Sequence, residues 1–346
     1  MSSPLIFLLL LALPLAISAG KCRIGTVVNR PFTNQPYSFP TNWNESHSAP
    51  HLDADQSCSW VVTIPQGFYV KLVIAGRIND SVGHFQMVDG NGNVVMSQHE
   101  NKEPYYFPSP KFTLIVNNEA PATLGFKVMW APYPQTTSVI AGIGGTAHVI
   151  NITKDVFASE FGSSSGISLL PFPAEQGRNH YTLRSALVFQ GFNTNGTYLT
   201  NLFNIYNTHQ QAIYPSSAAI YVINVEPRGV LDELVVQSAE YTRDLNPYSE
   251  LLCAPGTTCT RTLKGTSNSK SGLVHVGRGN QTLTAITMDT TATLSIYYGS
   301  QWAFFYDSTY NGSTIQSQLP LTFWGSYMTQ YIISSGEAKF TFQISN

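Results

Sequence analysis

The stretch Ser57-Cys58-Ser59-Trp60-Val61-Val62-Thr63-Ile64-Pro65-Gln66-Gly67 joins a cysteine, a core-type tryptophan, a β-branched run and a turn. Val, Ile, Thr and Trp are enriched in strands, and Pro-Gln-Gly ends the run as a turn does. We therefore expect a strand here whose cysteine can cross-link it to another segment.

The sequence around this stretch consists of short alternating runs that Gly, Pro, Asn and Asp interrupt. Apolar and polar residues alternate over 111–116 and 123–130, and the segment 117–121 between them has turn composition. A hairpin tip is expected at 89–93. This pattern is typical of antiparallel β structure. Residues 20–133 are therefore predicted to form one compact, jelly-roll-like β-sandwich.

The alternating pattern pauses at 130–136, where two prolines remove strand donors, and we place a domain boundary there. The remainder, 137–346, is a second β-rich region, either one unit or two with a sub-boundary near 245. Its clearest expected strands are 220–225, 273–276, 293–298 and 339–344.

One short helix is expected in this second region. Leu199, Leu202, Phe203 and Tyr206 follow a period near 3.6 from a start at residue 195 or 197, and the helix must end before Pro215. The predicted fold class is therefore all-β, with at most one or two short helices.

The two halves of the chain also echo each other faintly. Residues 114–120 and 124–128 resemble 331–338 and 340–344, and 303–312 is similar to 85–92. Duplication of a sandwich explains such an echo, so a second sandwich is the better interpretation of the remainder.

The first residues predict the secretory pathway. Leu5 to Ile17 is an almost unbroken apolar run that ends in the small residues Ser18, Ala19 and Gly20. This indicates a signal peptide over residues 1–19, and no further membrane span is expected. The protein is thus expected to be extracellular, or to reside in a lysosome-like lumen.

Asn-x-Ser/Thr sequons agree with secretion and predict surface glycans. They lie at Asn44, Asn79, Asn151, Asn195, Asn280 and Asn311.

Four cysteines in an oxidising compartment should pair, in one of three ways. Proximity favours Cys22 with Cys58 and Cys253 with Cys259. The spacings fit neither a metal site nor a redox motif, so a structural role is expected and no cofactor is predicted.

Charge excludes one class of partner. Charged residues make up 11% of the chain and the net charge is −2, with 18 Lys and Arg against 20 Asp and Glu. No basic stripe is present to neutralise phosphates, so nucleic acid and anionic membrane surfaces are not expected as partners.

Residues 58–72 resemble the Cys-x-Trp-x-Ile, Pro, Gly, Leu run of CUB domains. Together with the 101–108 segment and the 117–122 turn, they are similar to the nematode CUB-like domain family of secreted proteins. The resemblance is specific over 21–133 and looser over 137–346. It implies tandem CUB-like β-sandwiches, secretion and a setting in innate immunity and defence against pathogens, without an established enzyme activity.

The sequence departs from CUB domains proper in two respects. Those commonly carry two disulfides per module and often a calcium site of one Glu and two Asp. The first module here has two cysteines, and the acidic trio does not map onto its residues. Calcium-dependent binding is therefore not carried over.

Three segments superficially match catalytic or metal motifs. Gly162 to Gly166 fits a nucleophile elbow but lacks the parallel α/β context. The loop from His47 to Asp55 holds two imidazoles and two carboxylates in a spacing that fits no recognised site, and 89–98 begins like an EF-hand loop without its later ligands. A solvated loop or turn explains each, and no catalytic or metal residue is predicted.

Aromatic residues, 12% of the chain, are the remaining functional hint. Tyr105, Tyr106 and Phe107 lie between two prolines, where a strand interior is not expected, and are the candidate ligand contacts. The alternative is a loop folded back over the core.

The sequence thus favours a secreted, non-catalytic binding protein whose target is a glycan or another protein. The alternatives are a secreted hydrolase with a site assembled from distant residues, and a structural protein of a lumen or matrix.

Overall fold

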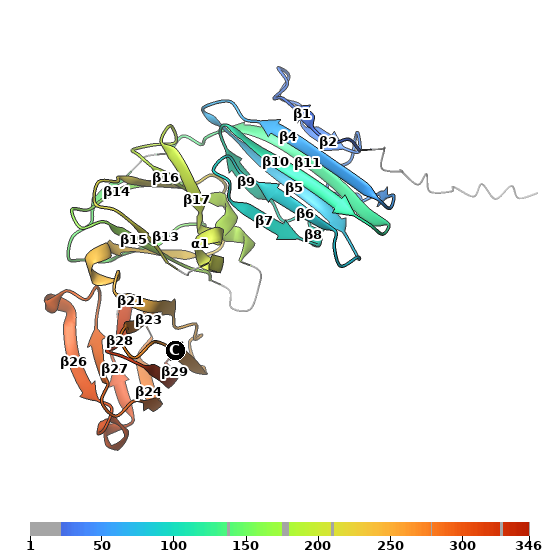
Figure 1. Cartoon of the computed structure of the whole chain (residues 1–346). Helices are drawn as coiled ribbons and strands as arrows, with labels where there is room; N and C mark the ends of the chain where they lie inside the picture. Colours follow the sequence, from blue (N-terminus) through green and yellow to red (C-terminus); the bar gives the residue numbers. More distant parts are fainter. Residues whose placement is uncertain are drawn as a thin grey trace, which may run out of the picture. The chain divides into compact units, whose positions relative to one another are not determined.

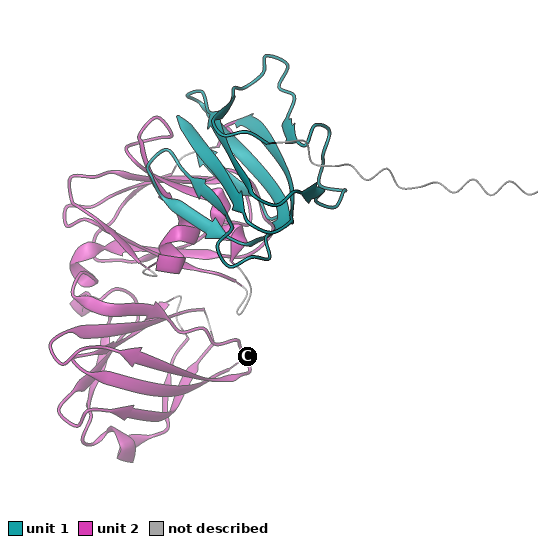
Figure 2. Ribbon diagram, turned by 45° about the vertical axis from the view of Figure 1, so that its right-hand side comes forward, with its two compact units in different colours: residues 1–131 teal, residues 132–346 magenta. Residues whose placement is uncertain are grey.

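The structure is a computed structural model that describes residues 22–136, 139–174, 180–208, 211–277, 279–325 and 328–345. The predicted signal peptide, residues 1–19, lies outside the described residues. The chain divides into two compact units, residues 1–131 (unit 1) and 132–346 (unit 2), which Figure 2 shows in different colours.

Unit 1 is one β-sandwich of two facing sheets, labelled in Figure 1. The first sheet has the order β1-β4-β10-β6-β7, and the second β2-β11-β5-β8, with β3 beside β11 and β9 beside β5. The strands are β1 (Thr26–Val28), β2 (Tyr37–Phe39), β3 (His51–Leu52), β4 (Gln56–Thr63), β5 (Phe68–Arg77), β6 (His84–Val88), β7 (Val94–Ser97), β8 (His99–Asn101), β9 (Tyr105–Pro108), β10 (Lys111–Asn118) and β11 (Ala122–Pro132).

The stretch from Ser57 to Gly67 contains most of strand β4, which contributes side chains to the core of this sandwich. β4 alternates buried and partly exposed residues, so that Cys58, Trp60 and Val62 point into the core. The Trp60 ring lies 4.9 Å from that of Phe39 and 4.8 Å from that of Phe126, between centroids. The expected strand is confirmed, and its aromatic contacts join the two sheets.

Unit 2 holds two further sandwiches. The second sandwich, residues 139–238, has sheets β12-β14-β19-β16-β17 and β13-β20-β15-β18. Its elements are β12 (Val139–Gly142), β13 (His148–Asn151), β14 (Phe157–Gly162), β15 (Ile167–Phe172), η1 (Tyr181–Ser185), β16 (Ala186–Gln190), β17 (Thr197–Asn201), α1 (Leu202–Thr208), β18 (Ala212–Tyr214), β19 (Ile220–Asn224) and β20 (Glu233–Ser238).

The third sandwich, residues 245–344, has sheets β21-β23-β28-β25-β26 and β22-β29-β24-β27. It follows a 3-10 turn, η2 (Ala239–Tyr241). Its elements are β21 (Leu245–Glu250), β22 (Thr258–Lys264), β23 (Lys270–Val276), β24 (Gln281–Met288), β25 (Thr293–Tyr297), η3 (Ala303–Phe305), β26 (Tyr306–Asn311), η4 (Ile315–Gln318), β27 (Leu321–Phe323), β28 (Met328–Ile333) and β29 (Glu337–Ile344).

All three sandwiches repeat one topology. In each five-stranded sheet the first strand of the sandwich runs parallel to its neighbour, and the other pairings are antiparallel. The predicted all-β, tandem-sandwich fold is therefore confirmed, with a parallel pair at one edge of each sandwich as the exception to antiparallel pairing.

One of the two internal sequence similarities corresponds to equivalent strands in the structure. Residues 114–120 and 124–128 fall on β10 and β11, and their counterparts 331–338 and 340–344 fall on β28 and β29, which hold the same places in the third sandwich. The other echo was wrong: 303–312 covers η3 and β26, which is equivalent to β7 and not to the β6 segment. Turn composition alone produced that similarity.

The expected helix is shorter than predicted. The segment from Thr197 to Asn201 is strand β17, because it pairs with β16, and α1 spans Leu202–Thr208. Leu202 and Ile205 are its buried residues. Sheet pairing thus overrides the helical period in the first half of the segment.

The second and third sandwiches pack against each other within unit 2. Leu170 and Val235 of one share a buried cluster with Val274 and Ile332 of the other. Three buried polar side chains accompany them: Gln237 donates to the Tyr248 hydroxyl (2.6 Å), which donates to Gln330 (3.1 Å), which donates back to Gln237 (3.3 Å). Because the triangle is closed, these groups are satisfied without water.

No helix among the residues that the structure describes is long and apolar enough to cross a membrane.

Candidate functional site

The aromatic residues that the sequence singled out are buried. Tyr105, Tyr106 and Phe107 are 4%, 2% and 6% exposed and form strand β9, which pairs with β5. Phe107 stacks on Phe112 at 4.2 Å, and Tyr106 lies 6.2 Å from the Tyr69 ring. Their assignment as ligand contacts was wrong, because β9 pairs with β5 and all three side chains are buried against other protein residues.

A group of neighbouring exposed aromatic side chains lies instead on the third sandwich. We name Trp302, Phe304, Phe305 and Tyr306 the aromatic cluster; they occupy η3 and the start of β26. Trp302, Phe304 and Tyr306 are 44%, 77% and 49% exposed. Ring centroids are 5.6 Å apart for Trp302 and Phe304, and 5.3 Å for Phe304 and Phe305.

The turn that carries the aromatic cluster is held by its backbone. Gly299 has a φ of 141°, and a Cβ at this position would lie 2.9 Å from the Phe305 ring, so glycine is required. The Gly299 carbonyl accepts a hydrogen bond of 2.6 Å from buried Gln330. Phe305 N–H donates to the Trp302 carbonyl (2.9 Å), and Tyr298 N–H to that of Phe305 (2.8 Å).

Contacts with the second sandwich fix the preceding residues. The Ser300 hydroxyl donates to the Gly145 carbonyl, and the Gln301 amide donates to the Tyr241 carbonyl. A Cβ on Gly145 would overlap the Trp302 ring, so the close approach of this ring requires glycine. The aromatic cluster is thus preorganised, so binding to it costs little side-chain entropy.

A pocket of about 370 Å³ adjoins the aromatic cluster. Phe305 and Tyr298 form one wall, and His148, Ile150 and Met328 contribute to the remainder. A volume of this size is at the lower end of small-ligand sites.

The chemistry available at the aromatic cluster is stacking and apolar contact. Burial and the neighbouring Tyr306 raise the pKa of Tyr297, so this flanking phenol stays neutral. Neutral aromatic faces of this kind stack on sugar rings or anchor a protein partner.

Sequence reasoning missed this site because it interpreted 303–307 as an ordinary hairpin strand. The available signal was the run Trp302-Ala303-Phe304-Phe305-Tyr306, whose aromatics do not alternate with polar residues as a half-buried strand requires.

Both disulfides predicted from proximity are present. Cys22 pairs with Cys58, which ties the first described residue to β4, and Cys253 pairs with Cys259 in the third sandwich.

The predicted glycosylation sites all lie at least partly at the surface. Asn79, Asn151, Asn195 and Asn311 are exposed, and Asn44 and Asn280 are half-buried.

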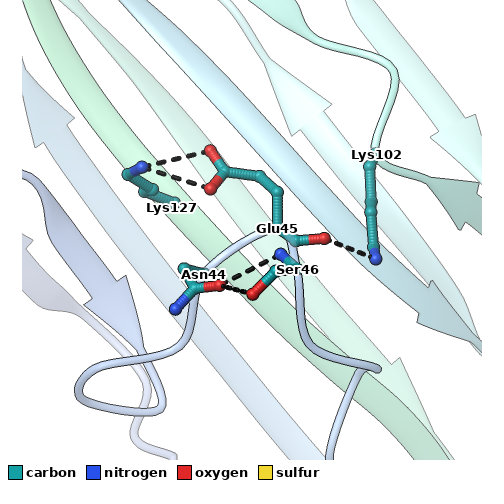
Figure 3. A network of polar contacts seen from close by, with 5 residues as sticks. All are labelled: Asn44, Glu45, Ser46, Lys102 and Lys127. Carbon is teal, nitrogen blue, oxygen red and sulfur yellow. Dashed lines mark hydrogen bonds and ion pairs between the residues drawn. The ribbon is translucent and has the colours of Figure 1, made fainter.

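Asn44 belongs to a polar network that fixes the loop before β3 (Figure 3). Its side-chain oxygen accepts hydrogen bonds from the Ser46 N–H (3.0 Å) and hydroxyl (2.5 Å). Lys127 donates to both carboxylate oxygens of Glu45 at 3.2 Å, and Lys102 donates to the Glu45 carbonyl at 2.6 Å. Partial burial opposes ionisation of Glu45, but a backbone N–H and the lysine charges outweigh it and hold its pKa below the usual value.

The segments with motif-like sequences form loops and turns. Within 22–136, His51 lies 3.5 Å from Asp53, and both side chains are exposed. The Asp89 carboxylate accepts from the N–H groups of Asn91 and Asn93, which closes the β6–β7 hairpin as expected. The Gly162 to Gly166 segment connects β14 and β15. Across the described ranges, no group of three or more His, Cys, Asp or Glu could hold a metal ion.

Comparison with known proteins finds a family match at the N-terminal end of the chain. The model of the CUB-like domain family matches residues 18–134. No curated protein matches the sequence.

Several solved structures are similar at low identity. The CUB1-EGF-CUB2 domain of human MASP-1/3 is 9% identical, with a TM-score of 0.22, and covers 59% of this chain and 99% of that chain. The extracellular region of zebrafish Gpr126/Adgrg6 is 10% identical, with a TM-score of 0.25, covering 94% and 53%. These values are too low to carry an argument about function. The family match is specific in its range, because residues 18–134 are the part of this chain that the CUB-like domain model matches.

Proposed function

We propose that this chain is a secreted glycoprotein that acts as a non-catalytic binding module in the innate immune response to pathogens, and that the aromatic cluster is its ligand surface. The observation that carries the proposal is the exposure of Trp302, Phe304 and Tyr306 on a turn fixed by backbone hydrogen bonds. The CUB-like domain at 18–134 and the two disulfides support an extracellular binding role. The defence setting rests on the resemblance noted in the sequence.

The ligand that best fits such a surface is a microbial glycan. Exposed aromatic rings that are rigidly held offer flat apolar faces at low entropic cost, and the adjoining pocket of about 370 Å³ can admit one sugar residue or its substituent. We further propose that each sandwich is a domain, with boundaries near 134 and near 245.

Phe304→Ser is expected to weaken binding to the glycan by about tenfold, because one stacked ring contributes about 1 to 3 kcal/mol. The ligand would first be found on a microbial glycan and cell-wall array, with and without a chelator. The affinity of wild type and variant for that sugar would then be compared by titration calorimetry.

Phe192→Ser is the matched control for this experiment. Phe192 is 69% exposed against 77% for Phe304, but it lies in a loop of the second sandwich outside the aromatic cluster. Its replacement should leave affinity unchanged. Equal losses in the two variants would contradict the assignment of the site, and an array without any bound sugar would contradict glycan recognition. Turnover of an arrayed substrate would indicate a hydrolase.

Removal of N-glycans from the secreted protein is expected to lower its mass, since each predicted sequon asparagine is at least partly exposed. Peptide-N-glycosidase F treatment followed by intact-mass spectrometry measures this change. The matched variant Asn311→Gln should lose one glycan mass. A wild-type mass that the enzyme does not alter would contradict the glycoprotein assignment.

A further inference from the structure

A cavity of about 340 Å³ lies in unit 2, where the second and third sandwiches meet. The ends of β15 and β20 form one side of it, and the ends of β21 and β23 form the other. Apolar side chains, among them Phe172, Leu251 and Val276, make up much of the wall. The cavity shares no residue with the aromatic cluster.

Two buried polar side chains in this wall carry atoms without a hydrogen-bond partner among the described residues. Glu250 is 5% exposed; its Oε1 accepts a hydrogen bond of 2.7 Å from the Tyr206 hydroxyl, but its Oε2 has no partner among the described residues. His275 is 4% exposed, and neither of its ring nitrogens reaches a described partner with hydrogen-bonding geometry. Buried polar groups are usually satisfied, so these atoms are available to hydrogen-bond a water molecule or a ligand inside the cavity.

The electrostatics of the wall are acidic. Burial raises the pKa of Glu250 to about 7. The hydrogen bond from Tyr206 and the positive charge of Arg261 act to lower this pKa, but their effect is smaller. Burial also raises the pKa of Glu233, the second carboxyl group of the wall. Burial lowers the pKa of His275 to about 4, and the backbone of Leu251, which acts to raise this pKa, has a smaller effect. This imidazole is therefore neutral at physiological pH.

Further charges lie around this group. Tyr206 contacts the His180 ring at 4.6 Å, and burial lowers the pKa of His180 against the charge of Asp232. Burial makes the charged forms of Glu250 and Glu233 unfavourable when they are alone. A positive charge inside the cavity would favour these charged forms and would in turn be stabilised by them.

The residues that line the cavity include two carboxyl groups and a neutral imidazole, but neither Lys nor Arg. We propose that this cavity binds a small molecule with one ammonium group and a compact apolar body. The ammonium group would donate to Glu250 Oε2 and Glu233, and the apolar body would contact Phe172, Leu251 and Val276. A metal ion fits less well, because the described residues offer no group of three ligands.

Benzylamine is a suitable probe, and benzyl alcohol is its neutral counterpart of the same shape. Titration calorimetry with the full chain should give an affinity for benzylamine about tenfold above that for benzyl alcohol at about pH 8, because a charged hydrogen bond in a buried site is strong. Benzylamine should bind about tenfold more weakly at about pH 5, where Glu250 is protonated. Equal affinity for both probes, or binding that does not change with pH, would overturn the proposal.

Glu250→Gln keeps the acceptor for Tyr206 but removes the charge, and should abolish the preference for benzylamine. Glu337→Gln, an exposed carboxylate on β29, is the matched control and should leave it intact. A preference that survives Glu250→Gln would contradict the assignment.

Leu231 allows a test that leaves the buried groups in place. It lines the cavity and is 57% exposed, so substitutions there are tolerated by the fold. Leu231→Arg should weaken benzylamine binding and Leu231→Asp should strengthen it, each by a few-fold. The same direction of change in both variants would contradict binding of a cation.

Discussion

Trp60→Ala is expected to lower the free energy of unfolding of unit 1 by about 4 kcal/mol, the usual cost of truncating a large buried aromatic side chain. Trp60 is 1% exposed and packs on Phe39 and Phe126 of the opposite sheet. Its loss removes the contact between sheets and leaves a cavity that β4, paired on both sides by β1 and β10, cannot close. Chemical denaturation followed by fluorescence measures the change in the unit 1 transition.

Trp324→Ala is the control for this prediction. The residue type and the change are the same, but Trp324 is 75% exposed, and its hydrogen bond to the Tyr298 hydroxyl is made by the backbone N–H. Its replacement should change stability by no more than about 0.5 kcal/mol. A comparable loss in the two variants would mean that Trp60 does not hold the two sheets together.

Glu250→Gln is expected to stabilise unit 2 at alkaline pH by up to about 3 kcal/mol, and to make its stability rise with pH where that of the wild type is nearly constant. The folded-state pKa of Glu250 is raised to about 7 from an ordinary value of 4.5. Its favourable contribution is therefore complete below pH 4.5, where the group is protonated in both states, and is lost as the pH rises through 7.

His275 acts in the opposite direction. Its pKa falls to about 4 from an ordinary 6.5, so its contribution is complete above pH 6.5 and is lost as the pH falls through 4. Between these limits the two slopes nearly cancel in the wild type. In Glu250→Gln the His275 contribution is no longer opposed by that of Glu250, although the raised pKa of Glu233 still opposes it, so stability should rise with pH relative to the wild type.

Denaturant titrations at about pH 5, 6, 7 and 8 distinguish these cases. His275→Gln should give the mirror image, a stability that falls as the pH rises. Parallel curves for wild type and Glu250→Gln would show that the Glu250 carboxyl is not neutralised by burial. The same curves establish that the variants used with benzylamine are folded.

The repeat of one topology three times suggests how the chain divides its roles. The first sandwich carries the CUB-like match and its Cys22–Cys58 disulfide. The second contacts the third through a closed polar triangle, and Gln330 of that triangle also holds the Gly299 carbonyl below the aromatic cluster. Gln330 therefore takes part both in the contact between the two sandwiches and in the turn that carries the aromatic cluster.

The sequence by itself determined the features that depend on neighbouring residues. Alternation over β4, β10 and β11 predicted strands, because side chains of a strand point alternately to opposite faces. The 89–93 turn followed from Asx chemistry, and the disulfide pairs followed from separation along the chain. These properties depend on residues that are close together in the sequence.

Tertiary structure decided which aromatic residues reach the surface. Tyr105 to Phe107 and Trp302 to Tyr306 have similar composition, yet the first segment pairs with β5 and is buried, whereas the second projects from a turn. The Glu250 cavity likewise combines β21 and β23 with the nearby strand β20 and with β15, which lies roughly 80 to 100 residues earlier in the sequence. Burial is set by what covers a segment from elsewhere in the chain, and no local pattern contains that information.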